Sequence, residues 1–382
     1  MRVSNLSKPS GWSKEFTRRF GILAALVAAL VSPHTQAVHF VNVEDPSHNT
    51  EPPADPAQAR LWHLQGDWNA FLGTPIAAYW FVTAKHVGGS LGDQLQLMGK
   101  PYTTIVRIPD PESDLALWGV ATPFPDQATL YQGSRETSRR VVLFGKGPAR
   151  GEAVWVEVNE TPVLKGWKWG NQHKVRRWGE NVIDQIEVGP YPRGRKLGEL
   201  LVAFFDLDGL PSEAGLSGGD SGGAMFLWSN RQWQLAGIHY AAGGVFKLKE
   251  GDEPFDAMLF DERGLHRRNW SEEEGETWPL TALDANPQPG PIVATRISHR
   301  ASWIQQQITT FANPLEAIAL ESAERPDGPY VKVDQWTLHT HPLGLVVDKP
   351  DHTRFFRVKS TTALRMLAPR QEGTRLILPF DG

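Results

Sequence analysis

Short β-favouring segments recur along this 382-residue chain and constrain its fold more than any other feature. They span residues 75–83, 103–108, 141–144, 153–158, 182–188, 200–205, 224–228 and 234–240. Glycine, proline or charged residues separate them, and the 36 Gly and 29 Pro favour many turns over long helices. An apolar content of 40%, with 15 Trp and 17 Phe, is enough to fill a globular core. The sequence therefore predicts an all-β protein built from sandwiches or barrels.

Residues 1–37 have the pattern of a secretory signal peptide. Five basic residues precede the apolar run at residues 20–31, and Thr35-Gln36-Ala37 provides small residues at a cleavage position. The alternative is a membrane anchor, but a run of twelve residues is too short to span a bilayer comfortably. We therefore expect a secreted or periplasmic protein, with no transmembrane segment after the signal is removed.

Charge and cysteine content exclude several classes of protein. Removing the signal takes away five basic residues and one glutamate, so the formal net charge changes from −4 to −8. A mildly acidic chain without a basic stripe is not expected to bind nucleic acid. The absence of cysteine excludes disulfides, thiolate metal sites and cysteine nucleophiles.

No metal or cofactor is expected. The segment Asp206-Leu207-Asp208-Gly209 is similar to the opening of a calcium loop, but the remaining ligands are missing at the required spacing. We expect a turn there. His339 and His341 are two residues apart without an accompanying carboxylate or third histidine, and we expect them at the surface.

The pentapeptide Gly219-Asp220-Ser221-Gly222-Gly223 presents one hydroxyl between residues with almost no side chain. A serine hydroxyl needs an adjacent base to become a nucleophile. Acyl transfer also needs backbone N–H groups directed at the oxygen that becomes negative, and glycines permit such a turn. The pattern indicates a nucleophilic serine.

Two upstream motifs supply the possible partners of Ser221. An apolar run at residues 78–87, Ala-Tyr-Trp-Phe-Val-Thr-Ala-Lys-His-Val, contains His86 near its end. Asp114 lies in Ser113-Asp114-Leu115-Ala116-Leu117 and is followed at once by an apolar segment. Taken alone, each residue is more often structural than catalytic.

Together, in the order His, Asp, Ser, these motifs resemble the trypsin/chymotrypsin-like serine peptidases. Residues 294–308 resemble the helix that closes this family's domain, because Ile297, Ala301, Ile304 and Ile308 have helical spacing. The resemblance covers roughly residues 40–310. It implies two packed six-stranded antiparallel β-barrels and a closing helix, with the active site in the cleft between the barrels. The lack of cysteine suits a bacterial, exported member.

The resemblance also implies roles for individual residues. His86 would be the base, Asp114 would orient it, and Ser221 would attack a peptide bond, forming an acyl-enzyme. The backbone amides of Gly219 and Ser221 would form the oxyanion hole. Gly215 would lie at the base of the primary specificity pocket, and the segment Tyr240-Ala241-Ala242-Gly243 would run along the substrate and form one pocket wall. A glycine at position 215 argues against strict selectivity for Lys or Arg.

Two local assignments stay open. Asp220 could pair with a new N-terminus at Val38, or with local backbone or an internal basic group. His239 could approach an acidic substrate residue or pack beneath the site.

The domains expected from this reading are a signal peptide at 1–37, a protease domain at 38–311, and a linker with a small C-terminal β-module at 312–382. A charged insertion at 245–288 would border the cleft or form a solvated loop. The predicted function is that of an exported serine endopeptidase acting on proteins or peptides. The alternatives are a catalytically idle binding protein with the same fold and an esterase with the same triad.

Overall fold

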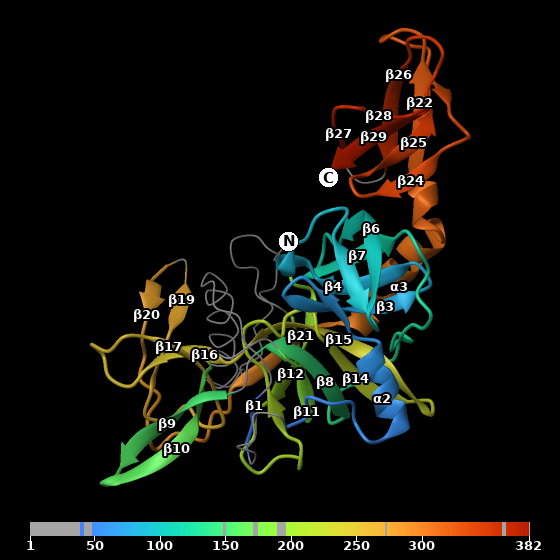
Figure 1. Cartoon of the computed structure of the whole chain (residues 1–382). Helices are drawn as coiled ribbons and strands as arrows, with labels where there is room; N and C mark the ends of the chain where they lie inside the picture. The colour runs from blue at the N-terminus through green and yellow to red at the C-terminus, as the bar shows by residue number, and fades with distance from the viewer. Residues whose placement is uncertain are drawn as a thin grey trace, which may run out of the picture.

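The computed structural model describes residues 39–41, 48–147, 150–170, 175–188, 196–271, 273–360 and 364–381. Within these ranges the chain is all-β apart from two α-helices and two short 3-10 helices. Two closed six-stranded antiparallel barrels form its centre (Figure 1), which confirms the predicted fold. The predicted signal peptide and Val38 lie outside the described residues. No helix in these ranges is long and apolar enough to cross a membrane.

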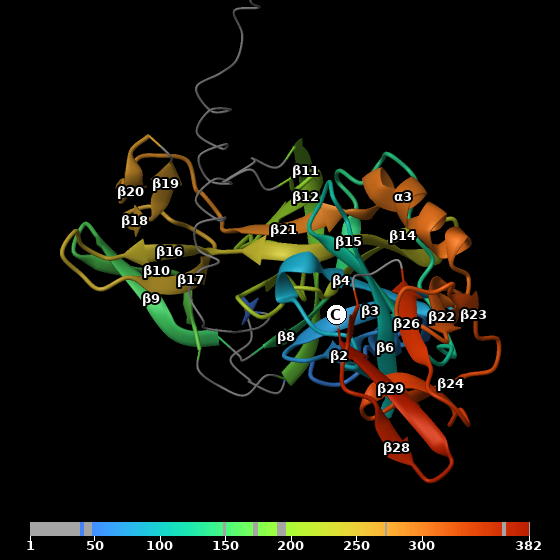
Figure 2. The ribbon, with the colours of Figure 1, turned by 90° about the horizontal axis from the view of Figure 1, so that it is seen from above.

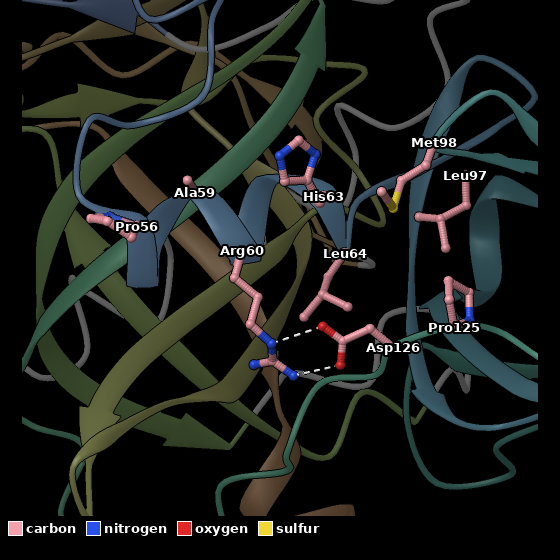
Figure 3. A pocket seen from close by; sticks show the side chains of 9 residues that line it. All are labelled: Pro56, Ala59, Arg60, His63, Leu64, Leu97, Met98, Pro125 and Asp126. Atoms are coloured by element: carbon pink, nitrogen blue, oxygen red, sulfur yellow. Dashed lines mark hydrogen bonds and ion pairs between the residues drawn. The ribbon is translucent and has the colours of Figure 1, made fainter.

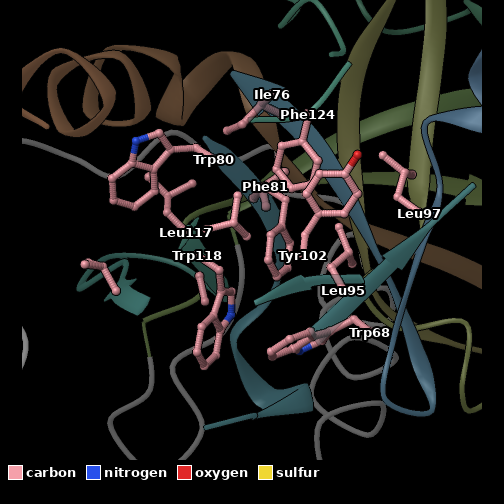
Figure 4. Close-up of a cluster of buried hydrophobic side chains, with 14 of the residues drawn as sticks. Trp68, Ile76, Trp80, Phe81, Leu95, Leu97, Tyr102, Leu117, Trp118 and Phe124 are labelled. Atoms are coloured by element: carbon pink, nitrogen blue, oxygen red, sulfur yellow. The ribbon is translucent and has the colours of Figure 1, made fainter. Parts of the chain in front are cut away.

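The first barrel is closed by hydrogen bonds between neighbouring strands in the order β2-β3-β4-β7-β6-β5. These strands are β2 (Gly66–Trp68), β3 (Phe71–Ala77), β4 (Trp80–Ala84), β5 (Gln94–Leu97), β6 (Lys100–Pro109) and β7 (Leu115–Val120). Figure 4 shows the aromatic side chains that fill it, among them Trp68, Phe81 and Trp118, which are fully buried. A short helix, α2 (Pro56–His63), precedes this barrel and begins at Asp55, whose carboxylate accepts a hydrogen bond from the Gln58 amide.

The second barrel has the order β11-β12-β21-β15-β14-β8. Its strands are β8 (Arg140–Gly147), β11 (Val175–Val188), β12 (Glu199–Phe204), β14 (Ala224–Ser229), β15 (Gln232–Ala242) and β21 (Pro291–Arg296). A separate two-stranded pair, β1 (His39–Phe40) with β13 (Ala214–Gly215), involves the chain shortly before Ser221.

The predicted strand at residues 75–83 is two strands. β3 ends at Ala77 and β4 begins at Trp80, so Ala78 and Tyr79 make the turn of a hairpin. Neither turn residue has a positive φ, and neither is Gly, Pro, Asn or Asp. The turn therefore lacks the sequence signature that would have revealed it.

Helix α3 (Ile297–Thr310) directly follows β21 and matches the predicted closing helix, with Ile297, Ala301 and Ile304 buried. Its end is tied to the first barrel, because the Trp80 indole donates a 2.8 Å hydrogen bond to the Phe311 carbonyl. The helix thus connects the last strand of the second barrel to the first barrel.

A five-stranded antiparallel sheet projects from the second barrel, as the two views in Figures 1 and 2 show. Its order is β18 (His266–Arg267), β16 (Gly244–Lys247), β17 (Phe255–Leu259), β10 (Thr161–Trp169) and β9 (Arg150–Val158). The predicted strand at 153–158 therefore belongs to neither barrel. Much of the charged segment 245–288 is folded rather than a solvated loop, since Phe246, Met258 and Leu265 are fully buried. A hairpin of β19 (Asn269–Ser271) and β20 (Gly275–Thr277) follows.

The C-terminal part of the chain forms the predicted β-module. After the 3-10 helix η4 (Pro314–Ala317), one sheet has the order β23-β22-β26, and another has the order β24-β25-β29-β27 with β28 also paired to β29. The bounds are β22 (Ile318–Ala323), β23 (Val331–Lys332), β24 (Thr337–Thr340), β25 (Leu343–Asp348), β26 (Phe355–Ser360), β27 (Arg365–Met366), β28 (Arg370–Glu372) and β29 (Arg375–Asp381).

This module packs on the first barrel. Leu343 and Phe380 belong to the same buried apolar cluster as Leu95 of β5. The approach at η4 is close, because a Cβ added to Gly119 of β7 would lie 2.7 Å from the Pro314 ring.

Candidate active site

His86 lies immediately after the buried strand β4, in the 3-10 turn η2 (Lys85–Val87). All five residues of β4 are buried, and its aromatic and β-branched side chains favour a strand. The turn that carries His86 begins where this strand ends. The Lys85 amide donates a 2.8 Å hydrogen bond to the Asp114 carbonyl. The backbone before His86 is therefore attached to the turn that carries Asp114.

Asp114 holds His86 at two points. Its Oδ2 lies 2.5 Å from the ring Nδ1, and its Oδ1 accepts a 3.2 Å hydrogen bond from the His86 backbone amide. The Asp114 side chain is 7% exposed and the His86 side chain 19% exposed. Since the carboxylate accepts at Nδ1, the neutral ring presents Nε2 as an acceptor.

Ser221 lies between β13 and β14, a strand of the second barrel, with its Oγ 2.9 Å from His86 Nε2. Serine and histidine are 135 residues apart in sequence. The structure thus brings the three predicted side chains into one hydrogen-bonded chain across the junction of the barrels. A serine, a histidine and a carboxylate in this arrangement can transfer a proton from the hydroxyl while its oxygen attacks.

Three of the backbone amides around Ser221 donate to backbone carbonyls. Within the described residues, the Asp220, Gly222 and Gly223 amides donate to backbone carbonyls, whereas those of Gly219 and Ser221 make no hydrogen bond. Gly219 has φ of 102°, a conformation that other residues rarely adopt. An oxyanion hole requires two amides beside the nucleophile, and Gly219 and Ser221 are the residues that the sequence predicts for it.

The Asp220 side chain is buried and bonded locally. Its Oδ2 accepts from the Ser217 amide at 2.8 Å and the Ser217 hydroxyl at 3.3 Å. Burial raises the pKa of this carboxyl well above its usual value, against the opposing effects of the Ser217 hydrogen bonds and the charge of Arg177. The contacts observed for Asp220 are local ones with Ser217, and Val38, its other proposed partner, lies outside the described residues.

His239 packs beneath the site. Its side chain is buried, and a Cβ added to Gly223 would lie 3.1 Å from its ring. Burial lowers the pKa of His239 to about 3, so the ring is neutral at physiological pH. A neutral buried ring is not placed to attract an acidic substrate residue.

The residues predicted to contact substrate lie near the triad or behind it. Tyr240 is buried, with its ring edge-on to that of His86 at 5.7 Å between centroids. Ala241 and Ala242 are partly exposed at the end of β15. Gly243 has a positive φ of 58°, and a Cβ there would lie 2.3 Å from the Ala257 carbonyl oxygen.

Gly215 is enclosed by apolar side chains. A Cβ at this position would lie 2.4 Å from Met258 and 3.0 Å from Phe205. Met258 comes from β17, inside the charged insertion 245–288 that the sequence analysis expects to border the cleft or to form a solvated loop. No local sequence signal connected Met258 with Gly215, because β17 is placed by its pairing with both β10 and β16.

Sequence reasoning also missed the residues that support Asp114. Lys85, Asp110 and Arg300 surround the turn before β7, and the contacts they make are described below. Lys85 adjoins His86, which could have drawn attention to it, but nothing in the sequence connects Asp110 with Arg300.

A surface pocket of about 440 Å³ lies away from these residues, between α2 and the first barrel (Figure 3). Its walls include Leu64, Leu97 and Met98, and the paired Arg60 and Asp126 lie at its side. None of its lining residues belongs to the triad or to the predicted substrate-binding set.

No protein-family model matches the chain, and no curated protein matches it either. Among solved structures, the chain is similar to the inactive form of a serine-to-alanine mutant of Rv3671c from M. tuberculosis H37Rv. The identity is 15% and the TM-score 0.38, over 71% of this chain and 97% of that one. A likeness at this level has no bearing on the chemistry of the site.

Proposed function

We propose that this protein is an exported serine endopeptidase of the trypsin/chymotrypsin-like type. The observation that carries the proposal is the pair of hydrogen bonds from His86, one to Asp114 and one to Ser221, at the junction of two closed barrels. A histidine bonded to a buried carboxylate and to a partly buried hydroxyl has the geometry of an activated nucleophile.

In the proposed reaction, Ser221 Oγ attacks the carbonyl carbon of a peptide bond while His86 Nε2 takes the hydroxyl proton. Asp114 keeps the Nδ1 proton facing it and stabilises the imidazolium that forms. His86 then gives its proton to the departing amine as the C–N bond breaks, which leaves an acyl ester on Ser221. Water attacks that ester by the same route and regenerates the hydroxyl.

The backbone amides of Gly219 and Ser221 would bind the oxygen that becomes negative in both steps. Losing one such donor typically costs about 3 kcal/mol of transition-state stabilisation.

The proposed substrates are proteins or peptides with an apolar residue before the cleaved bond. Gly215 adjoins Met258 and Phe205, and these groups carry no charge that would attract lysine or arginine. Ala241 and Ala242, which are small and partly exposed at the end of β15, would leave room for an apolar substrate side chain. A peptide-library profile dominated by Lys or Arg would overturn this preference.

Export is part of the proposal and rests on residues 1–37, which have the pattern of a signal peptide. The expected location is the periplasm or the cell exterior. Fractionation of a bacterial host, with sequencing of the mature N-terminus, tests it. Recovery of an uncut chain in the cytoplasm would contradict it.

The enzymatic proposal is tested with a quenched peptide library and a simple ester, using wild type and Ser221→Ala. We expect peptide cleavage by wild type and none by Ser221→Ala of equal thermal stability. Ester hydrolysis without peptide cleavage would favour an esterase. Lack of activity on both substrates would favour a binding protein on the same fold.

A further inference from the structure

A buried carboxylate organises the turn that carries Asp114. Asp110 follows β6, and its side chain has no exposed surface. Its Oδ1 accepts from the Glu112 amide at 3.0 Å, and its Oδ2 accepts from the Ser113 hydroxyl at 2.5 Å. The Asp110 amide also donates to the Leu115 carbonyl at 2.8 Å. These bonds define the shape of residues 110–115.

Arg300 of α3 neutralises this carboxylate. Its Nε and Nη2 donate to the two oxygens of Asp110, each at 2.6 Å, in a two-pronged arrangement. The two residues are 190 positions apart. Because α3 follows the last strand of the second barrel, the pair ties that barrel's closing helix to the Asp114 turn of the first.

Lys85 ties the same turn to His86. Its ammonium group donates to the carbonyls of Asp110, at 2.7 Å, and Ser113. Lys85, which precedes His86, and Ser113, which precedes Asp114, are thereby both bonded to the same turn.

We propose that Asp110 and Arg300 are positioning residues, which hold the 110–114 turn so that Asp114 meets Nδ1 of His86. The four donors on Asp110 satisfy both of its oxygens, so rotation of the carboxylate would break bonds to Arg300, Glu112 and Ser113 together. Neither residue contacts His86 or Ser221 in the bonds described. They act through Asp114, and the proposal therefore rests on the proposed function.

The test compares Arg300→Met with wild type, alone and combined with Asp114→Asn. If Arg300 acts through Asp114, Arg300→Met lowers kcat about 10- to 100-fold with little change in KM. In the Asp114→Asn background, Arg300→Met should lower kcat by less than about threefold, because the interaction that Arg300 supports is already lost. Equal losses in the two backgrounds, or an unchanged kcat, would overturn the proposal.

A matched control comes from the same barrel. Arg60 and Asp126 form the same two-pronged pair at 2.7–2.8 Å, but they are about half exposed and lie beside the pocket in Figure 3. Arg60→Met should leave kcat unchanged. If Arg300→Met does not fold, Arg300→Lys and Ser113→Ala are used instead. Each is measured in the wild-type and the Asp114→Asn background, and we expect a smaller loss of kcat.

A second readout separates this proposal from the proposed function. The short hydrogen bond between His86 Nδ1 and Asp114 should give a downfield proton NMR signal that can be recorded without substrate. We expect it to move or broaden in Arg300→Met and to stay unchanged in Arg60→Met. If wild type cleaves no substrate, the proposed function fails while this signal still decides the positioning role. A signal unchanged by Arg300→Met would overturn that role.

Discussion

His86 and Asp114 are joined by two hydrogen bonds, one from the ring and one from the backbone amide. A single bond would leave the carboxylate free to rotate, whereas two bonds fix both the carboxylate and the imidazole. The ring therefore has one tautomer suited to accept the Ser221 proton. The substitutions below each change one part of this site or of the fold that supports it.

Asp114→Asn should lower kcat on the order of 10⁴-fold with little change in KM, because the amide cannot hold the same tautomer. Steady-state kinetics on the best library peptide measures this. Asp126→Asn is the matched control, since Asp126 is an exposed aspartate on the same barrel. Loss of less than tenfold in Asp114→Asn would contradict the orienting role.

Gly219→Ala should lower kcat about 10²- to 10³-fold, because φ of 102° is strained for alanine and the amide would turn from the developing oxyanion. Gly251→Ala is the control, since a Cβ there meets nothing within 4 Å and its φ is ordinary. Full activity in Gly219→Ala, with its backbone unchanged, would remove this amide from the oxyanion hole.

Glu213 should make the protein less stable as pH rises. Burial raises its pKa from 4.5 to about 7, so between these values the folded chain holds a proton that the unfolded chain has lost. Its contribution is complete below about pH 4.5 and is lost as pH rises through about 7, amounting to about 3 kcal/mol at most.

Urea unfolding from pH 5 to 8 measures this effect. The free energy of unfolding should fall more steeply with pH in wild type than in Glu213→Gln, which cannot titrate there. Identical slopes in the two proteins would show that the Glu213 carboxyl does not couple to folding in this range.

Phe81→Ala should destabilise the protein by about 3–5 kcal/mol, because Phe81 is fully buried against Trp68, Trp118 and Phe124 (Figure 4). Met98→Ala, at a side chain 64% exposed, should change stability by less than about 0.5 kcal/mol. Equal losses from the two substitutions, measured by denaturant unfolding, would contradict the packing described.

The sequence was sufficient where the signal is local. Ser221 lies in a glycine-rich turn, His86 follows an apolar strand, and the face of α3 repeats at helical spacing, so each could be identified from a few residues. The barrels also followed from the recurrence of short strands, together with the family resemblance.

Sequence reasoning failed where partners are distant. β17 is placed by its pairing with β10, a strand about ninety residues earlier, and with β16. A local turn was missed as well, because Ala78 and Tyr79 include no Gly, Pro, Asn or Asp. Arg300 meets Asp110 across 190 residues. Such contacts depend on the completed fold and leave no pattern in a short window of sequence.

The most direct test of the central claim is intact-mass analysis after reaction with a fluorophosphonate, followed by mapping of the modified peptide. We expect one adduct per chain, on Ser221, formed far more slowly in folded His86→Ala and absent in Ser221→Ala. An adduct on another residue, none at all, or an undiminished rate without His86 would contradict the claim that His86 activates Ser221.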